Sequence, residues 1–328
     1  MAINYQYANL LRAGSFGINV FSQDDLDQIH MATLDVLWNI GLLVKSPKAR
    51  IIFGDNGCAV DEKTEIVKIP SHLVEDAIQS TPATYRAHAI NPENDYVPGG
   101  KKTGFVNFGE AATLIDPITR EVRDATKKDV DDSVRFIDTL ENCIGWERPL
   151  TPRDLDEEMA SIYNAYSFFS YSSKHGFLGI YSVEHFKAAV KMGAVIAGGE
   201  DKLSQNPLFT CSADPVSPLV LTEDATDVLI EACTFGAPIK INGLGLAGGT
   251  TCVDLASTLV THNSEVLGSI TLGQLVRKGA PMVYGSSTSI MDMRTTLASM
   301  GAPEMAMLSA AVAKLAQFYK MPSWVGGG

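Results

Sequence analysis

The spacing of apolar residues changes along the chain, and this change predicts where helices and strands occur. From residue 143 onward, short apolar runs alternate with longer stretches that have helical apolar spacing. The short runs predict strands at residues 143–146, 176–180, 208–211, 238–241, 281–284 and 322–325. The stretches between them predict helices at residues 155–169, 183–196, 223–235, 253–276 and 303–319. This strict alternation predicts a parallel sheet with helices outside it, because each parallel crossover needs a helix-sized connection.

Two kinds of parallel sheet fit this alternation. An open doubly wound sheet can stop at six strands, whereas a (β/α)₈ barrel needs eight. No G-x-G-x-x-G motif follows the first strand, which disfavours a dinucleotide-binding sheet. The glycine-rich stretch at residues 243–249 follows the fourth strand and is weak evidence for phosphate binding. The pattern therefore predicts an α/β fold that is either an open parallel sheet or a TIM (β/α)₈-type barrel, incomplete here, with about six strands present.

The chain before the regular alternation has a mixed pattern. Ser22 with Asp25 predicts one helix N-terminus, and Thr126 with Asp129 predicts a second. Between them, helices and short β segments follow without a regular repeat, including β structure within residues 103–115. We predict an N-terminal α+β region at residues 1–125 and a partial barrel at residues 126–328, with strands 1 to 6 present and the remaining barrel missing.

Charge and cysteine usage narrow the class of protein. The formal net charge of −12 disfavours nucleic acid and anionic membranes as partners, because both need a positive face. The 5 cysteines are scattered and form no C-x-x-C pair, which is typical of a reducing compartment. The start of the chain lacks a signal-peptide pattern, and no run of about 18 apolar residues predicts a transmembrane helix. We predict a cytoplasmic protein.

Candidate site residues follow from the geometry of such barrels, whose active sites lie at the C-terminal ends of the strands. The substrate-pocket candidates are Trp146, Glu147, Cys211, Asp214, Asn242, Tyr284, Ser286, Ser287, Trp324, Gly326, Gly327 and Gly328. Each has a structural alternative: Cys211 fits an ordinary core thiol, Asp214 a turn before a proline, and the two serines a cap. His175 precedes its strand, which favours a structural role.

Two further polar residues lie on the helix predicted at residues 253–276. Asn263 interrupts an apolar stripe and His262 lies at its edge, so we expect buried structural hydrogen bonds there. No metal-ligand spacing, H-E-x-x-H motif or G-x-S-x-G nucleophile elbow occurs, and we expect no bound metal. The residues present therefore form no complete catalytic set.

Several segments resemble one family, the trimethylamine methyltransferases, which are corrinoid-dependent enzymes of methanogens and some anaerobic bacteria. They are L-V-T-H-N-S-E-V-L (residues 259–267), V-Y-G-S-S-T (283–288), G-A-P-E (301–304), V-A-K-L-A-Q-F-Y (312–319), P-S-W-V-G-G-G (322–328), I-H-M-A-T-L-D-V-L (29–37) and N-G-C-A-V-D-E-K-T-E-I-V-K-I-P (56–70). The resemblance covers nearly the whole chain and is densest after about residue 255.

The resemblance implies a TIM barrel and a defined reaction. It implies methyl transfer from trimethylamine to the cobalt(I) of a cognate corrinoid protein, giving dimethylamine, in methylamine-dependent methanogenesis or related anaerobic metabolism. The partner protein carries the corrinoid, so no cofactor is expected to bind this chain directly. We expect the full-length protein to form a homo-oligomer. With a cationic amine as the substrate, the resemblance implies aromatic faces for it at Tyr284 and Trp324, and both residues fit the core equally well.

The resemblance also implies a residue beyond those printed. In the trimethylamine enzymes an in-frame amber codon is read as pyrrolysine, and the family pattern places it directly after Gly328. We therefore expect that the chain is truncated at an amber codon and that the chain as given is an inactive fragment. Two alternatives stay open: a quaternary-amine methyltransferase of the glycine betaine type, which lacks pyrrolysine, and a non-catalytic fragment that binds an amine or a corrinoid protein.

Overall fold

The computed structural model describes residues 21–99, 103–107 and 109–327, so the candidate Gly328 lies outside the described residues. The central element is a seven-stranded sheet in the order β15-β13-β11-β9-β8-β7-β4, and every pair in it is parallel. Its strands are β4 (Phe105–Val106), β7 (Cys143–Glu147), β8 (His175–Gly179), β9 (Phe209–Ser212), β11 (Ile239–Gly243), β13 (Met282–Ser286) and β15 (Ser323–Val325). The sheet curls into a half-barrel, which is the TIM-barrel type of fold that the resemblance implies.

All six predicted strands are present, and β4 is an additional seventh strand. β4 comes from residues 103–115, which the sequence pattern assigned to the N-terminal α+β region. It pairs with β7 through Phe105 opposite Cys143 and Val106 opposite Gly145, with an irregular register between the two pairs. Two residues are too few for a periodic signal, so only the pairing shows that this segment belongs to the sheet.

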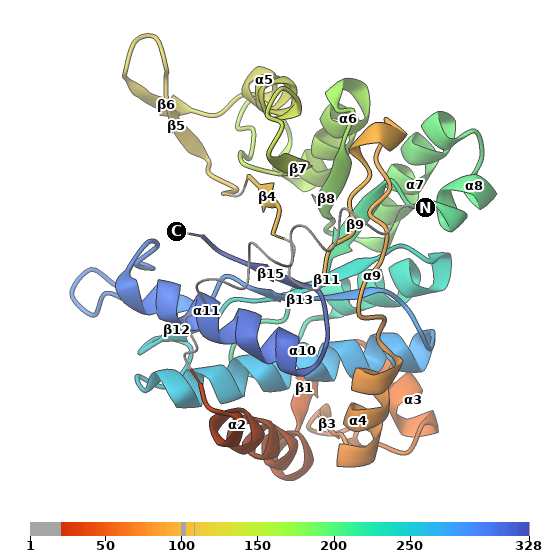
Figure 1. Ribbon diagram of the computed structural model, residues 1–328, viewed down its shortest axis with the longest axis vertical. Helices are drawn as coiled ribbons and strands as arrows, with labels where there is room; N and C mark the ends of the chain where they lie inside the picture. Colours follow the sequence, from red (N-terminus) through yellow and green to blue (C-terminus); the bar gives the residue numbers. More distant parts are fainter. Residues whose placement is uncertain (1–20, 100–102, 108, 328) are drawn as a thin grey trace.

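Helices cover one side of the curled sheet, and Figure 1 shows them arranged around it. They are α5 (Lys127–Asp138), α6 (Ala160–Tyr171), α7 (Val183–Ala197), α8 (Glu200–Gln205), α9 (Glu223–Phe235), α10 (Leu255–Val276) and α11 (Pro303–Phe318), with the 3₁₀ turn η3 (Glu157–Met159) before α6. Alternate strand residues pack against these helices. Trp146, for example, stacks on Phe168 of α6 at 6.1 Å between ring centroids. We call the opposite side of the sheet the interior side.

The N-terminal segment forms a second layer below the barrel helices (Figure 1). Its elements are α2 (Gln23–Asp35), the π-helical turn η1 (Val36–Ile40), β1 (Leu42–Val44), α3 (Pro47–Asp55), β2 (Ala59–Asp61), β3 (Ile66–Lys68) and α4 (Ser71–Ser80). The small sheet β10-β1-β3-β2 also takes β10 (Val220–Leu221) from the barrel region. Ser22 caps α2 with Asp25 in a capping box, as the sequence predicts.

The interior side at the N-terminal ends of the strands is filled by the segment around residues 85–96, which includes the 3₁₀ turn η2 (Pro92–Asn94). Tyr85 and Thr210 share a hydrogen bond of 3.0 Å between their hydroxyls. His175 Nδ1 donates to the His88 carbonyl at 2.8 Å, and its Nε2 lies 2.9 Å from Thr210 Oγ1. Burial lowers the pKa of His175 to about 4, so this histidine is a neutral structural residue at neutral pH.

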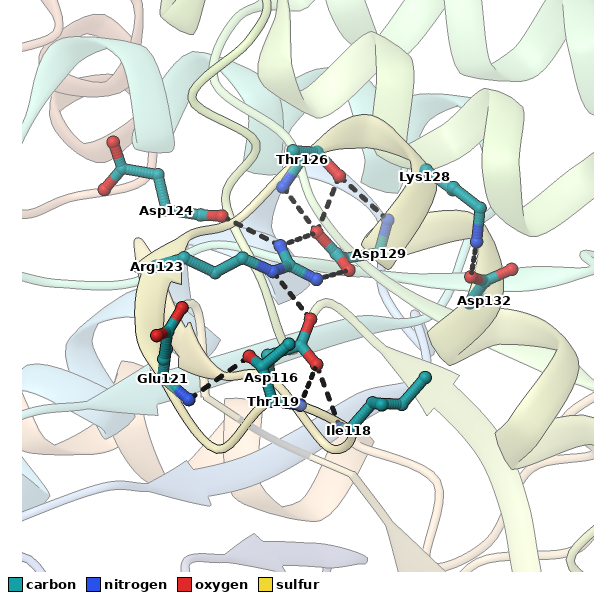
Figure 2. Close-up of polar contacts among 10 residues, drawn as sticks. All are labelled: Asp116, Ile118, Thr119, Glu121, Arg123, Asp124, Thr126, Lys128, Asp129 and Asp132. Atoms are coloured by element: carbon teal, nitrogen blue, oxygen red, sulfur yellow. Dashed lines mark hydrogen bonds and ion pairs between the residues drawn. The ribbon is translucent and has the colours of Figure 1, made fainter.

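A hairpin and a short two-stranded sheet complete the described elements. The hairpin joins β5 (Thr113–Ile115) to β6 (Val122–Asp124), and the sheet pairs β12 (Leu246–Ala247) with β14 (Ser289–Ile290). Arg123 of the hairpin contacts both Asp116 and Asp129, the latter in the first turn of α5 (Figure 2). The hairpin projects from the upper left of the molecule in Figure 1 but is anchored to α5 by these contacts. Among the described residues, no helix combines the length and apolar character needed to span a membrane.

Candidate active site

The candidate site lies on the interior side, near the C-terminal ends of the strands. The lysine of β11, Lys240, contacts Glu147 of β7 through its Nζ, although β9 and β8 lie between these strands. In a flat sheet, strands in these positions would be about 14 Å apart at ~4.8 Å per strand. The two side chains therefore meet because the sheet curls and because the lysine is long. Both are buried, with side-chain exposures of 2% and 8%.

An aromatic ring forms the other contact of the lysine. Lys240 Nζ lies 4.1 Å from the centroid of the Trp324 ring on β15. An ammonium over an indole face is attracted by the negative face of the ring. Trp324 itself packs with Val283 of β13 and Tyr85. β7, β11 and β15 thus each contribute one side chain to a single buried contact between a carboxylate, an ammonium and an aromatic ring.

The two carboxylate oxygens of Glu147 have different surroundings. Oε1 pairs with Lys240, whereas Oε2 is buried and has no hydrogen-bond partner among the described residues. Burial raises the pKa of the Glu147 carboxyl, the positive charge of Lys240 opposes this shift, and the negative charges of Asp214 and Glu110 add to it. The backbone of Glu147 is held by Asn107, whose Oδ1 accepts from the Glu147 N–H at 3.1 Å.

Further charged groups surround this pair at the C-terminal ends of β7, β8 and β9. Arg148 pairs with Glu110 and donates to the Tyr181 hydroxyl at 2.5 Å. Asp214 Oδ1 accepts a hydrogen bond of 2.7 Å from Ser212 Oγ, and its side chain is exposed at the rim. The cluster holds three carboxylates, of Glu110, Glu147 and Asp214, and two basic side chains, of Arg148 and Lys240. This balance favours a small cation over an anion.

Five of the sequence candidates lie in or beside this interior region: Glu147, Asp214, Asn242, Ser287 and Trp324. Asn242 stands two residues after Lys240 and therefore faces the same, interior side of the sheet. Its Nδ2 donates to Ser287 Oγ at 3.2 Å. Asn242 and Ser287 thus continue the polar interior surface along β11 and β13. The structure brings these five together from strands that are far apart in the sequence.

Four other candidates point to the helix side. Trp146 Nε1 lies 3.4 Å from Ser133 Oγ of α5, and the Tyr284 hydroxyl donates to Asn263 Oδ1 of α10 at 2.5 Å. Cys211 is fully buried, and burial raises the pKa of its thiol, which fits a protonated core cysteine. Ser286 Oγ accepts from the Thr288 N–H at 3.1 Å. These placements follow from the period of two along a strand, because neighbouring residues face opposite sides.

The end of the described chain borders a cavity of about 430 Å³. Residues of both edge strands line it, including Phe105 and Val106 of β4 and Trp324 of β15, together with Gly326 and Gly327. The Gly326 N–H donates to the Ser286 carbonyl at 3.0 Å, which fixes the start of the glycine run. A Cβ built on Gly327 would meet nothing within 4 Å, so the backbone there is open to close approach.

Sequence reasoning missed Lys240, although a signal for it exists. Within the apolar run P-I-K-I-N at residues 238–242, the lysine and the asparagine stand two positions apart. They must therefore face the same side of a strand whose other residues are apolar. A lysine in a buried strand needs a charged partner, and this requirement alone singles it out.

Comparisons with known proteins agree with the resemblance. The family model described as trimethylamine methyltransferase (MTTB) matches residues 3–328. Trimethylamine methyltransferase MttB of Desulfitobacterium hafniense (strain DSM 10664 / DCB-2) is 48% identical, covering 98% of this chain and 65% of the relative. MttB of Methanosarcina barkeri (strain Fusaro / DSM 804) is 36% identical, covering 100% and 67%. Glycine betaine methyltransferase of D. hafniense (strain Y51) is 30% identical, covering 94% and 64%.

The chain spans about two thirds of the length of these curated relatives. Among solved structures, a hydroxylamine complex of MtmB matches with a TM-score of 0.59 at 10% identity, covering 97% of this chain and 64% of that one. The Methanosarcina barkeri monomethylamine methyltransferase MtmB matches with a TM-score of 0.52 at 12% identity, covering 97% and 70%. At these identities the structural likeness shows the fold alone.

Proposed function

The chain belongs to the trimethylamine methyltransferase family, and we propose that it transfers a methyl group from trimethylamine to the cobalt(I) of a corrinoid on a separate partner protein. Dimethylamine is the second product. The observation that carries this proposal is the 48% identity with a trimethylamine methyltransferase over 98% of this chain. The relative named for glycine betaine is 30% identical, so a quaternary amine is the second candidate substrate.

The interior site supports a small methylated ammonium ion as the substrate. Trimethylamine carries a positive charge at neutral pH. The site has three carboxylates and only two basic side chains, those of Lys240 and Arg148, so a bound cation would balance its charge. Trp324 offers an aromatic face beside them. Binding in this region would orient the amine and remove water from it, and these two effects commonly supply much of the catalysis in group transfer.

The methyl acceptor is a substrate that another protein brings. A cobalt(I) corrinoid supplies a strong nucleophile for the methyl carbon. The open backbone around Gly327 and the cavity beside Trp324 fit the approach of a large planar group to the interior site. The residues of this chain would hold the amine nitrogen in place while the methyl group is exposed to the acceptor.

Several expectations stay predictions. From the resemblance come the pyrrolysine directly after Gly328, the inactivity of the chain as given and the homo-oligomer, and from the cysteine usage and the lack of a signal-peptide pattern comes the cytoplasmic location. Reading the codon that follows the Gly328 codon tests the first: we expect TAG followed by a long open frame. A TAA codon, or no downstream frame, contradicts it.

Reconstitution tests the proposed reaction. The full-length protein is mixed with a cognate corrinoid protein in the cobalt(I) state and with trimethylamine, glycine betaine or no amine. We expect the corrinoid absorption spectrum to change to that of the methylated form, and dimethylamine to appear in equal amount, with trimethylamine only. If no methylamine methylates the corrinoid, the proposal fails, and methylation by glycine betaine alone would establish the second substrate class.

A further inference from the structure

One oxygen of a buried carboxylate at the candidate site has no donor. Glu147 is 6% exposed, its Oε1 pairs with Lys240, and its Oε2 has no hydrogen-bond partner within the described part of the chain. A buried acceptor without a donor carries a desolvation cost that a ligand can remove. Because Glu147 lies on the interior side of β7 near the C-terminal end, the donor it lacks would come from a molecule bound in the barrel interior.

The groups around this oxygen favour a positively charged donor. Lys240 is already engaged by Glu147 Oε1 and by the Trp324 ring, and Arg148 is engaged by Glu110 and Tyr181. Asp214 adds a further negative charge at the rim and accepts a hydrogen bond from Ser212 Oγ. The cluster therefore has one more carboxylate than basic side chains. A cationic N–H group would satisfy both the charge and the missing hydrogen bond.

We propose that Glu147 Oε2 accepts a hydrogen bond from the N–H of a protonated tertiary amine and thereby selects tertiary amines over quaternary ammonium ions. The inference rests on the proposed function and names Glu147 as the residue that distinguishes the two classes of substrate. A trimethylammonium ion carries one N–H, whereas a quaternary ion of nearly the same size and charge carries a methyl group there. The Trp324 face and the net negative charge attract both ions, so only a hydrogen-bond acceptor distinguishes them.

Binding of two small cations to the full-length protein tests this selection without any substitution. Trimethylammonium and tetramethylammonium are titrated separately by calorimetry at neutral pH, where both are cations. A charge-assisted hydrogen bond predicts that trimethylammonium binds about tenfold more tightly or better. Equal binding, tighter binding of tetramethylammonium, or no binding of trimethylammonium overturns the inference. If the two cations bind equally while trimethylamine still methylates the corrinoid, the inference fails and the proposed function stands.

Substitutions then assign the preference to Glu147. Glu147→Gln keeps the shape of the side chain but removes its charge, so both cations should bind more weakly. We expect trimethylammonium to lose about tenfold more affinity than tetramethylammonium, because only trimethylammonium also loses the charge-assisted hydrogen bond. Glu110→Gln is the matched control, because it removes one negative charge from the same cluster and should weaken both cations alike. A preference that survives in folded Glu147→Gln overturns the assignment.

A second substitution covers the case in which Glu147→Gln does not fold. Glu147→Asp keeps the negative charge beside Lys240 but shortens the reach of the carboxylate by one methylene. We expect the preference for trimethylammonium to fall by severalfold, with a cooperative thermal unfolding transition retained. A full preference in the aspartate variant overturns the assignment, because a hydrogen bond to Oε2 depends on that reach.

Discussion

The Tyr284 hydroxyl donates a hydrogen bond of 2.5 Å to Asn263 Oδ1, which joins strand β13 to the middle of helix α10. The Asn263 amide donates in turn to Thr33 Oγ1 and to the Tyr319 hydroxyl, each at 2.8 Å. The Tyr319 hydroxyl lies 3.1 Å from His30 Nδ1, so the hydrogen-bond network extends to helix α2. The expected structural role of Asn263 is confirmed, and the same contact explains why Tyr284 faces the helices.

Tyr284→Phe tests the energy of this network. We expect a loss of about 1–3 kcal/mol in the free energy of unfolding, because the change leaves the Asn263 oxygen buried without this donor. Urea unfolding followed by circular dichroism measures it. Tyr166→Phe is the control: Tyr166 is 55% exposed, so we expect a change within about 0.5 kcal/mol. Equal effects of the two substitutions would contradict the importance of the network.

Lys240→Met tests the buried ion pair and its dependence on pH. Because the attraction of Lys240 holds down the raised pKa of Glu147, the substitution should raise that pKa further. A carboxyl whose pKa is higher in the folded state stabilises the fold at low pH, and this contribution is lost as pH rises through the folded pKa. We therefore expect a larger stability loss at pH 7 than at pH 5, reaching about 3–5 kcal/mol.

Urea unfolding at the two pH values measures this difference. Lys278→Met is the control, since Lys278 is 68% exposed and pairs with Asp76 at the surface. Its effect should be small and nearly independent of pH in this range. A Lys240→Met protein that loses the same stability at both pH values would show that Glu147 does not change its protonation.

The hairpin contact in Figure 2 predicts a transition in acid. The Thr119 N–H, the Arg123 guanidinium and the Ile118 N–H lower the pKa of Asp116 to about 2. A lowered folded pKa gives stability that is present above the ordinary value near 4 and lost as pH falls toward 2. We expect the NMR chemical shifts of the backbone amides of residues 118 and 119 to change as the pH falls from about 4 toward 2. Asp116→Asn should remove this acid transition. If the transition persists in the variant, it arises from another titrating group.

Substitution by alanine at two glycines near the site should affect the stability of the fold differently. A Cβ on Gly285 would lie 2.6 Å from the Ile241 carbonyl oxygen, which is backbone and cannot move aside. Gly285→Ala should therefore cost about 1–3 kcal/mol in unfolding free energy. A Cβ on Gly327 meets nothing within 4 Å, so Gly327→Ala should be nearly neutral. Thermal unfolding of both variants decides, and similar losses would contradict the tight packing of β13 on β11.

The family and the order of elements could be read from the sequence. The apolar runs predict strands β7, β8, β9, β11, β13 and β15 of the main sheet to within a few residues, and the helix at residues 223–235 coincides with α9. The capping boxes at Ser22 and Thr126 are also present. The resemblance to the trimethylamine methyltransferases is confirmed by the family match over residues 3–328. These features depend on residues that are neighbours in the chain, so a local pattern contains them.

The candidate site depends on which residues of each strand face the interior side of the sheet, and the sequence left this open. Trp146 and Glu147 are adjacent, yet one packs on α6 and the other faces the interior side. Cys211 and Tyr284 likewise fall on the helix side. A position at the end of a strand places a residue at the correct end of the barrel, but only the strand's register assigns it to one side.

The sequence by itself determined the periodic elements, the helix caps and the family, because each rests on short-range spacing or on residue identity. Only the tertiary structure decided that Lys240 meets Glu147 across two intervening strands, that Trp324 covers the lysine, and that β4 joins β7. These contacts arise from the curl of the sheet and from pairings between segments far apart in the chain. No local pattern carries that information, because the same residues in a flat sheet would not touch.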